Sequence, residues 1–207
     1  MASIAEGRGR RAAWPLALVF AGAVAVGLAS YRYLLPGAPG GAPPILANSF
    51  ARYGFLTVHA GFAATALILG PFQFLRRMRL TRTALHRWTG RTYAVCSLSG
   101  GAAGLVLAFG ARTGPVSTAG FGSLAVLWIT ATSLAWRAAL ARRFAEHRRL
   151  MIRSYAMTFA AVTLRLYLPF AFLSPWGYDN AYRAISFLAW VPNVIVAELY
   201  LRRRPLP

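Results

Sequence analysis

The side chains of this chain that could carry chemistry are few, and the most unusual is Arg165, because it lies within a long apolar run. A charged side chain at membrane depth is costly and marks a functional site by default. His59 and Asn193 also lie within apolar runs. With a helical rise of about 1.5 Å per residue, His59 and Arg165 fall roughly 10 Å below one face and Asn193 roughly 13 Å below it. The three side chains are therefore predicted to line one polar pocket in the outer half of a membrane bundle.

Arg165 has no carboxylate at its own depth in this count. Glu198 is the only acidic residue within an apolar run, but it falls nearer the opposite face, where Arg202, four residues later, is its predicted partner. A bound anion, backbone carbonyls or water must then compensate Arg165. The alternative is that the long side chain extends to the membrane interface. The outer pocket is thus predicted to bind a small anionic ligand or a quinone.

Two further histidines, His86 and His147, lie in basic stretches that precede apolar runs. Neutral imidazoles on facing helices at equal depth can be the axial ligands of a haem iron. Neighbouring arginines such as Arg91 and Arg153 would suit haem propionates. The alternative is a pair of interfacial histidines facing lipid phosphates. Haem b is therefore the candidate cofactor, with His86 and His147 as its ligands, and no other metal is expected.

Composition indicates the class of protein. The residues are 57% hydrophobic and 13% charged, and the mean hydropathy is +0.50. All 23 basic residues are arginines, against four acidic residues, which gives a net charge of +19. Such a charge is typical of nucleic-acid binding in a soluble protein, but long apolar runs require a bilayer, so nucleic acid is not an expected partner. The single cysteine, Cys96, excludes a disulfide within the chain.

Six apolar runs predict an all-α, polytopic transmembrane bundle in one domain, residues 13–202. Short cytoplasmic tails, 1–12 and 203–207, are expected at its ends. The first run could instead be a signal peptide, but Tyr31 and Tyr33 at its end are typical of an interfacial anchor, so the span is expected to be retained. A loop rich in proline and glycine follows at 36–44. The predicted spans are 14–35, 53–75, 92–111, 119–140, 152–173 and 184–201.

The arginines predict the orientation of the bundle. Eighteen lie in the tails and in the stretches around 76–91 and 137–153, which would share one side of the membrane. Four lie on the other side, and Arg165 lies within a span. Because basic residues are retained on the cytoplasmic side, both termini are predicted to be cytoplasmic, and the expected location is the bacterial inner membrane.

The two basic stretches resemble each other. His86-Arg87 is followed by Arg91 and Tyr93, and His147-Arg148 is followed by Arg153 and Tyr155. The second copy is one residue longer. The pattern indicates two related helical hairpins around a common axis, although any basic loop of an arginine-rich protein would look similar.

Several short strings together resemble a bacterial family of predicted multi-pass membrane proteins that carries a domain-of-unknown-function label. They are His59-Ala60-Gly61, Gly70-Pro71-Phe72-Gln73-Phe74, Leu85-His86-Arg87 with Gly90-Arg91, Met151-Ile152-Arg153-Ser154-Tyr155-Ala156 after His147-Arg148, and Thr163-Leu164-Arg165-Leu166. The resemblance covers roughly residues 50–200. It implies a polytopic membrane protein whose marked residues include His59, His86, His147, Arg153 and Arg165, and it implies no activity.

Three functions follow from these observations. The first is a haem-b-binding or quinone-linked redox protein of the membrane. The second is a transporter of a small anionic or amphiphilic solute, indicated by the uncompensated Arg165 and the repeated hairpins. The third is a non-catalytic scaffold whose arginines contact anionic lipid or another membrane subunit. Whether the protein is an enzyme is left open by the sequence.

Overall fold

The computed structural model describes residues 17–35 and 50–203, and for residues 50 and 51 it describes the backbone alone. The predicted tail at 1–12, the start of the first span at 14–16, the loop at 36–44 and residues 204–207 lie outside the described residues. Within the described part of the chain every regular element is helical and no strand occurs, which confirms the all-α prediction.

The elements follow one another with short connections. An N-terminal helix at residues 17–30 continues into a 3₁₀ turn, η1 (Tyr31–Leu34). The later helices are α3 (Phe50–Gln73), α4 (Arg76–Thr81), α5 (Thr83–Ala108), α6 (Pro115–Leu140), α7 (Phe144–Thr158), α8 (Ala160–Phe172), α9 (Tyr178–Leu188) and α10 (Val191–Arg203).

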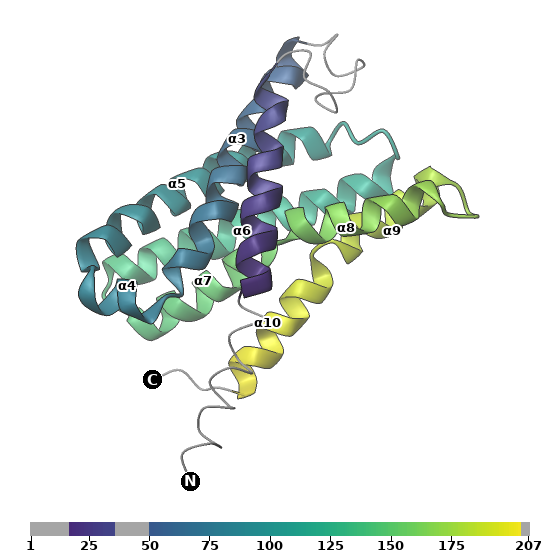
Figure 1. Ribbon diagram of the computed structural model, residues 1–207. Helices are drawn as coiled ribbons and strands as arrows, with labels where there is room; N and C mark the ends of the chain where they lie inside the picture. Colours follow the sequence, from purple (N-terminus) through teal and green to yellow (C-terminus); the bar gives the residue numbers. More distant parts are fainter. Residues whose placement is uncertain (1–16, 36–49, 204–207) are drawn as a thin grey trace.

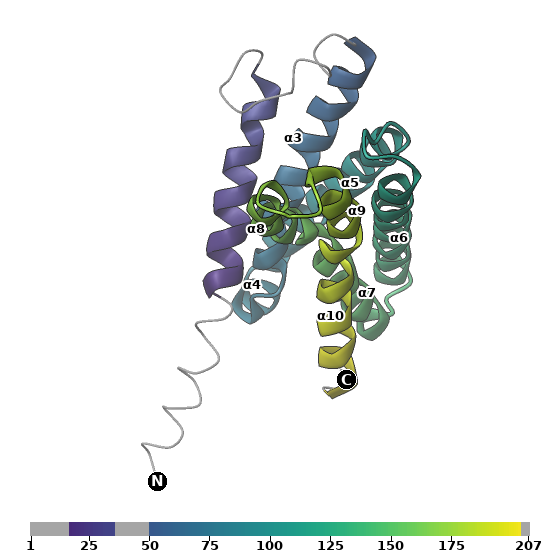
Figure 2. The ribbon, with the colours of Figure 1, turned by 90° about the vertical axis from the view of Figure 1, so that its right-hand side faces the viewer.

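Helices α3, α5, α6 and α7 pack in succession, each against the next (Figure 1). The N-terminal helix lies beside α3 at one edge of the bundle, and α6 forms the other edge (Figure 2). Ala23 of the N-terminal helix, Leu67 of α3 and Val162 of α8 form a small buried cluster that joins these three helices. The larger core surrounds Tyr93 of α5 and Tyr155 of α7.

Among the described residues, five segments are long and apolar enough to cross a membrane. They are Ala17–Leu34, Arg52–Gln73, Pro115–Leu140, Phe144–Phe172 and Tyr178–Arg203. Helix α5 has 26 residues but is not among them. Its first turns carry His86, Arg87 and Arg91, and its second half is rich in glycine, which together lower its hydropathy. The count of six spans and the cytoplasmic placement of the termini therefore stay predictions.

The last two predicted spans are each broken into two helices. The first break, between α7 and α8, lies at Phe159, where the hydroxyls of Thr158 and Thr163 bond backbone carbonyls one turn earlier. Such bonds compete with the helical ladder and bend helices. The second break, between α9 and α10, lies just before Pro192, which has no backbone N–H to donate.

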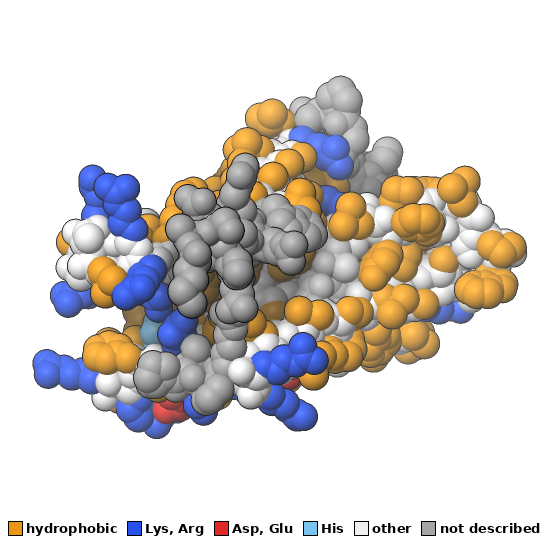
Figure 3. Space-filling view, turned by 60° about the horizontal axis from the view of Figure 1, so that its bottom comes forward, with side chains coloured by type: hydrophobic (Ala, Val, Ile, Leu, Met, Phe, Trp, Pro, Cys, Tyr) orange, Lys and Arg blue, Asp and Glu red, His pale blue; other side chains and the backbone are white. Residues whose placement is uncertain are grey.

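The basic stretches are helical rather than loops. Helix α4 and the first turns of α5 cover residues 76–91, and α7 begins at Phe144, eight residues before the predicted start of the fifth span. Hydropathy predicts only the part of a helix that lies in lipid. Because arginine is a good helix former, the helices continue beyond the apolar runs into the basic stretches. Their arginines gather at one end of the molecule, with a histidine visible among them, and apolar side chains cover much of the remainder (Figure 3). We call this the basic end.

Candidate functional site

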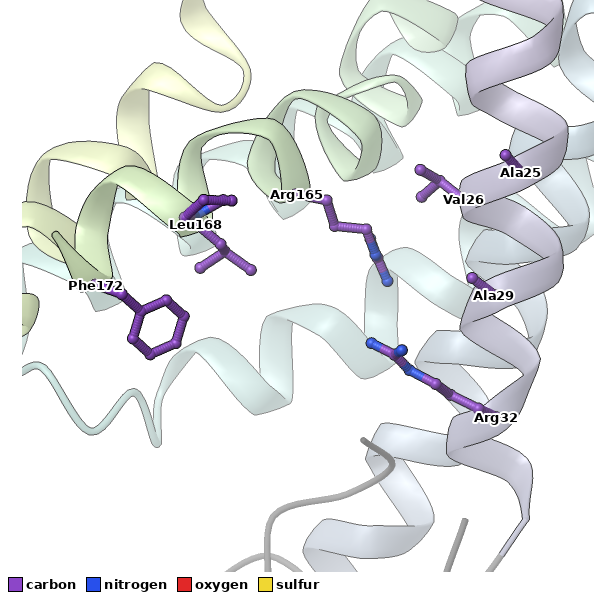
Figure 4. Close-up of a pocket in the computed structure, with 8 residues that line it drawn as sticks. Ala25, Val26, Ala29, Arg32, Arg165, Leu168 and Phe172 are labelled. Carbon is purple, nitrogen blue, oxygen red and sulfur yellow. The ribbon is translucent and has the colours of Figure 1, made fainter. Parts of the chain in front are cut away.

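An open cleft of about 560 Å³ lies between the N-terminal helix and α8. We call it the arginine cleft. Arg165 enters it from α8 and Arg32 from η1, and the two guanidinium groups point toward one another across the opening (Figure 4). The other lining residues are apolar: Ala25, Val26, Ala29, Leu168, Pro169 and Phe172. Two like charges thus line a groove that is otherwise apolar, although Arg32 is exposed and its guanidinium lies 5.2 Å from the centre of the Tyr33 ring.

Arg165 is held in place by neutral acceptors. One terminal nitrogen donates to the carbonyl of Ala161 at 2.9 Å, and the other donates to the hydroxyl of Ser30 at 2.8 Å. Ser30 in turn donates to the carbonyl of Val26 at 2.6 Å. Within residues 17–35 and 50–203 no carboxylate forms an ion pair with Arg165. A backbone carbonyl and one hydroxyl therefore compensate the charge of Arg165 in part.

His59 lies near this arginine but outside the cleft. Its Nδ1 donates to the carbonyl of Gly100 at 2.8 Å, and the ring packs against Gly104, where an added Cβ would lie 2.8 Å from Nδ1. Arg165 is close enough to His59 to act on it electrostatically. The charged residue that shares the cleft with Arg165 is instead Arg32, one of the four arginines predicted to lie on the outer side.

Asn193 connects the two broken spans. Its side-chain nitrogen donates to the hydroxyl of Thr163 at 3.0 Å and to the carbonyl of Ala189 at 3.2 Å. Thr163 lies in the first turn of α8, and Ala189 lies at the break between α9 and α10. Asn193 therefore joins the two helix breaks and is not among the residues that line the arginine cleft.

His86 and His147 occupy equivalent places, each the fourth residue of its helix, in α5 and α7. They are close enough for the charge of one to act on the other. Nδ1 of His147 donates to the carbonyl of Ala135 at 2.9 Å, which leaves Nε2 as the free ring nitrogen. Nδ1 of His86 is buried without a hydrogen-bond partner. Burial lowers the pKa of His86, and the charges of His147 and Arg79 lower this pKa further.

The two arginines predicted to suit haem propionates have other partners. Arg153 forms a bidentate ion pair with Glu198, with nitrogen–oxygen distances of 2.5 and 3.0 Å, which ties α7 to α10. Arg91 is exposed, and its guanidinium lies over the ring of Trp88, 5.2 Å from the ring centre. The structure therefore pairs Glu198 with Arg153 across helices, not with Arg202 along its own helix as the sequence predicted.

A buried hydroxyl network in the core was missed from the sequence. The phenol of Tyr93 bonds the hydroxyls of Ser154 and Thr158, each at 2.8 Å, and Ser154 also bonds Thr132 at 2.7 Å. These side chains join α5, α6 and α7. Tyr93 and Ser154 both lie in the repeated strings, but their side chains were not considered as partners because only the fold brings them together.

Long apolar helices, an arginine cleft open between helices and a basic end together define an all-α polytopic membrane protein. Its helices contact the lipid bilayer. The chain belongs to the family described as predicted membrane protein DUF2306, whose model matches residues 56–201. No curated protein and no solved structure matches the chain.

Proposed function

We propose that this protein is a membrane carrier for an anionic amphiphile, which it binds in the arginine cleft. The observation that supports the proposal is the meeting of Arg32 and Arg165 in an apolar groove of about 560 Å³. A volume of this size suits a small organic ligand. Two guanidinium groups without a carboxylate favour an anion between them, because like charges in an apolar setting need a counter-charge.

The lining indicates the two halves of the ligand. Leu168 and Phe172 offer apolar surface on α8, and Val26 offers it on the N-terminal helix, which suits a hydrocarbon tail. The guanidinium groups suit a carboxylate, sulfonate or phosphate head. A quinone could accept hydrogen bonds from the same two guanidinium groups, but it is neutral and would leave their positive charges uncompensated. An anionic ligand therefore suits the arginine cleft better than a quinone.

The broken helices support movement of the ligand. Discontinuous helices that meet near a binding site are a recurring feature of secondary transporters. Here Arg165 lies on α8, the second half of a broken span, and the Thr163–Asn193 contact joins this span to the other broken one. A rotation of α8 about Phe159 would change the distance between Arg165 and the N-terminal helix, and it would thereby open or close the arginine cleft.

Transport can be tested in liposomes that contain the purified protein. The probe is a long-chain fatty acid, and its movement across the bilayer is followed against its uncharged alcohol. Arg165→Gln should slow protein-dependent movement of the acid about 10- to 100-fold, since hydrogen bonds to charged groups contribute about 1.5–3 kcal/mol. The control is Arg112→Gln, which changes an exposed arginine outside the cleft. Equal rates for the wild type and Arg165→Gln would refute the proposal.

A haem-binding redox protein is the second candidate. It is favoured by the fixed orientation of His147, whose Nδ1 donates to Ala135 and leaves Nε2 for a ligand bond, as in many metal-bound histidines. The engagement of Arg153 by Glu198 counts against it, because that arginine is then not free for a propionate. Protein from haem-replete cells should show a Soret band that His147→Ala removes; a preparation without the band ends this candidate.

We also propose that the bilayer is the bacterial inner membrane, with the basic end in the cytoplasm. The distribution of arginines supports this orientation. The third predicted function, a non-catalytic scaffold whose arginines contact anionic lipid or another membrane subunit, stays a prediction.

A further inference from the structure

Four basic side chains gather at the basic end, away from the arginine cleft, and we call them the basic cluster. Arg79 comes from α4, His86 from α5, and His147 and Arg148 from α7. The charge of Arg148 acts on Arg79, and the charges of Arg79 and His147 act on His86. Three separate helices thus hold groups of one sign close together.

Two nitrogens in the basic cluster lack a partner. Nε of Arg79 and Nδ1 of His86 are buried, and neither makes a hydrogen bond. An unmet buried donor costs about 1–3 kcal/mol, and more for a charged group. Native structures pair nearly all such atoms with protein, water or a bound group, so each exception calls for a specific explanation.

The acidic residues of the described chain do not neutralise this cluster. Glu146 pairs with Arg143 at 2.8 Å, Glu198 pairs with Arg153, and no other ion pair occurs in residues 17–35 and 50–203. Burial and the charges of neighbouring arginines both lower the pKa of Arg79, so the cluster disfavours its own positive charge. A bound anion would offset both effects by supplying a nearby negative charge.

We propose that the basic cluster binds a phosphate group. Phosphate offers several acceptor oxygens to donors that converge from different helices, and it matches the guanidinium fork of arginine. Arg79 and Arg148 would supply charge, and His86 would donate to one oxygen in its protonated form. The phosphate could belong to an anionic lipid headgroup or be free in solution, because both present the same chemistry at this end of the bundle.

The test measures binding to purified protein in a neutral detergent. One arm adds inorganic phosphate and follows the thermal midpoint. The other arm adds phosphatidylglycerol and counts retained lipid by native mass spectrometry, with phosphatidylcholine as the neutral reference. A rise in midpoint with inorganic phosphate supports a free phosphate. Preferential retention of phosphatidylglycerol, without a phosphate response, supports a lipid headgroup.

Variants assign the binding to the cluster. Arg148→Gln should weaken whichever ligand binds by about tenfold or more, because it removes a charge-assisted contact. Arg149→Gln changes the next, exposed residue of α7 and should have little effect. If Arg148→Gln does not fold, His86→Asn provides the same comparison. The proposal is overturned if neither ligand binds, if both α7 variants behave like the wild type, or if a haem occupies the cluster and shows a Soret band.

Discussion

Replacement of Tyr93 by phenylalanine tests the account of the core. The change removes one hydroxyl that bonds Ser154 and Thr158, each at 2.8 Å. Neither partner is left unsatisfied, because Ser154 keeps Thr132 and Thr158 keeps the carbonyl of Ser154. Hydrogen bonds between membrane helices contribute about 0.6 kcal/mol on average and at most about 1.7 kcal/mol. Tyr93→Phe should therefore lower the free energy of unfolding by about 1 kcal/mol and by no more than about 3 kcal/mol.

The free energy of unfolding can be measured by titration of SDS into mixed micelles, with helix content as the signal. Tyr155→Phe is the matched control, because its buried phenol makes a longer bond of 3.5 Å to the carbonyl of Leu67. The control should lose less than half as much stability as Tyr93→Phe. A loss of more than about 4 kcal/mol for Tyr93→Phe, or equal losses for the two variants, would refute the reasoning.

The remaining predictions concern an ion pair, a helix contact and pH. Glu198→Gln should lower the free energy of unfolding by about 1 kcal/mol, because both side chains of the Glu198–Arg153 ion pair are about one-third exposed. A loss above about 3 kcal/mol would contradict this value. Gly100→Val should cost about 2 kcal/mol or more, since a Cβ would lie 3.1 Å from the backbone nitrogen of Ala63. A Cβ at Gly122 would meet nothing within 4 Å, so Gly122→Val should cost less in the same titration. Burial lowers the folded-state pKa of His86, so its contribution to stability is fully present above pH 6.5 and is lost as the pH falls below 6.5. The thermal midpoint of the wild type, measured without phosphate, should therefore fall as the pH is lowered below 6.5. The midpoint of His86→Asn should fall less over the same pH range.

The fold was largely predictable because membrane helices are set by length and composition. The apolar runs predicted an all-α membrane bundle, since a bilayer requires internal backbone hydrogen bonds. Hydropathy was less informative for α5, whose basic first turns and glycines lower its average although it packs at the centre of the bundle. Hydropathy also did not predict the two helix breaks. The break at Phe159 lies beside hydroxyl bonds to the backbone, and the break at Ala189 lies just before Pro192.

The candidate sites were predictable only in part. Arg165 stood out because an arginine in an apolar run is rare. His86 and His147 were predicted to lie at equal depth, and in the structure the charge of His147 acts on His86. The partner of Arg165 could not be predicted, because Arg32 lies at the end of a different helix and depth counting gives no lateral position. Arg79 was equally hidden among the arginines of its stretch, and only its packing distinguishes its buried Nε from the exposed groups around it.

The most direct test of the central claim is the affinity of the arginine cleft for an anion. Binding of a long-chain fatty acid and of its alcohol can be measured by titration calorimetry on the wild type and on Arg165→Gln. The wild type should bind the acid at least about tenfold more tightly than the alcohol, and Arg165→Gln should remove most of this preference. Equal affinity of the wild type for the two ligands, or an unchanged preference in Arg165→Gln, would contradict it.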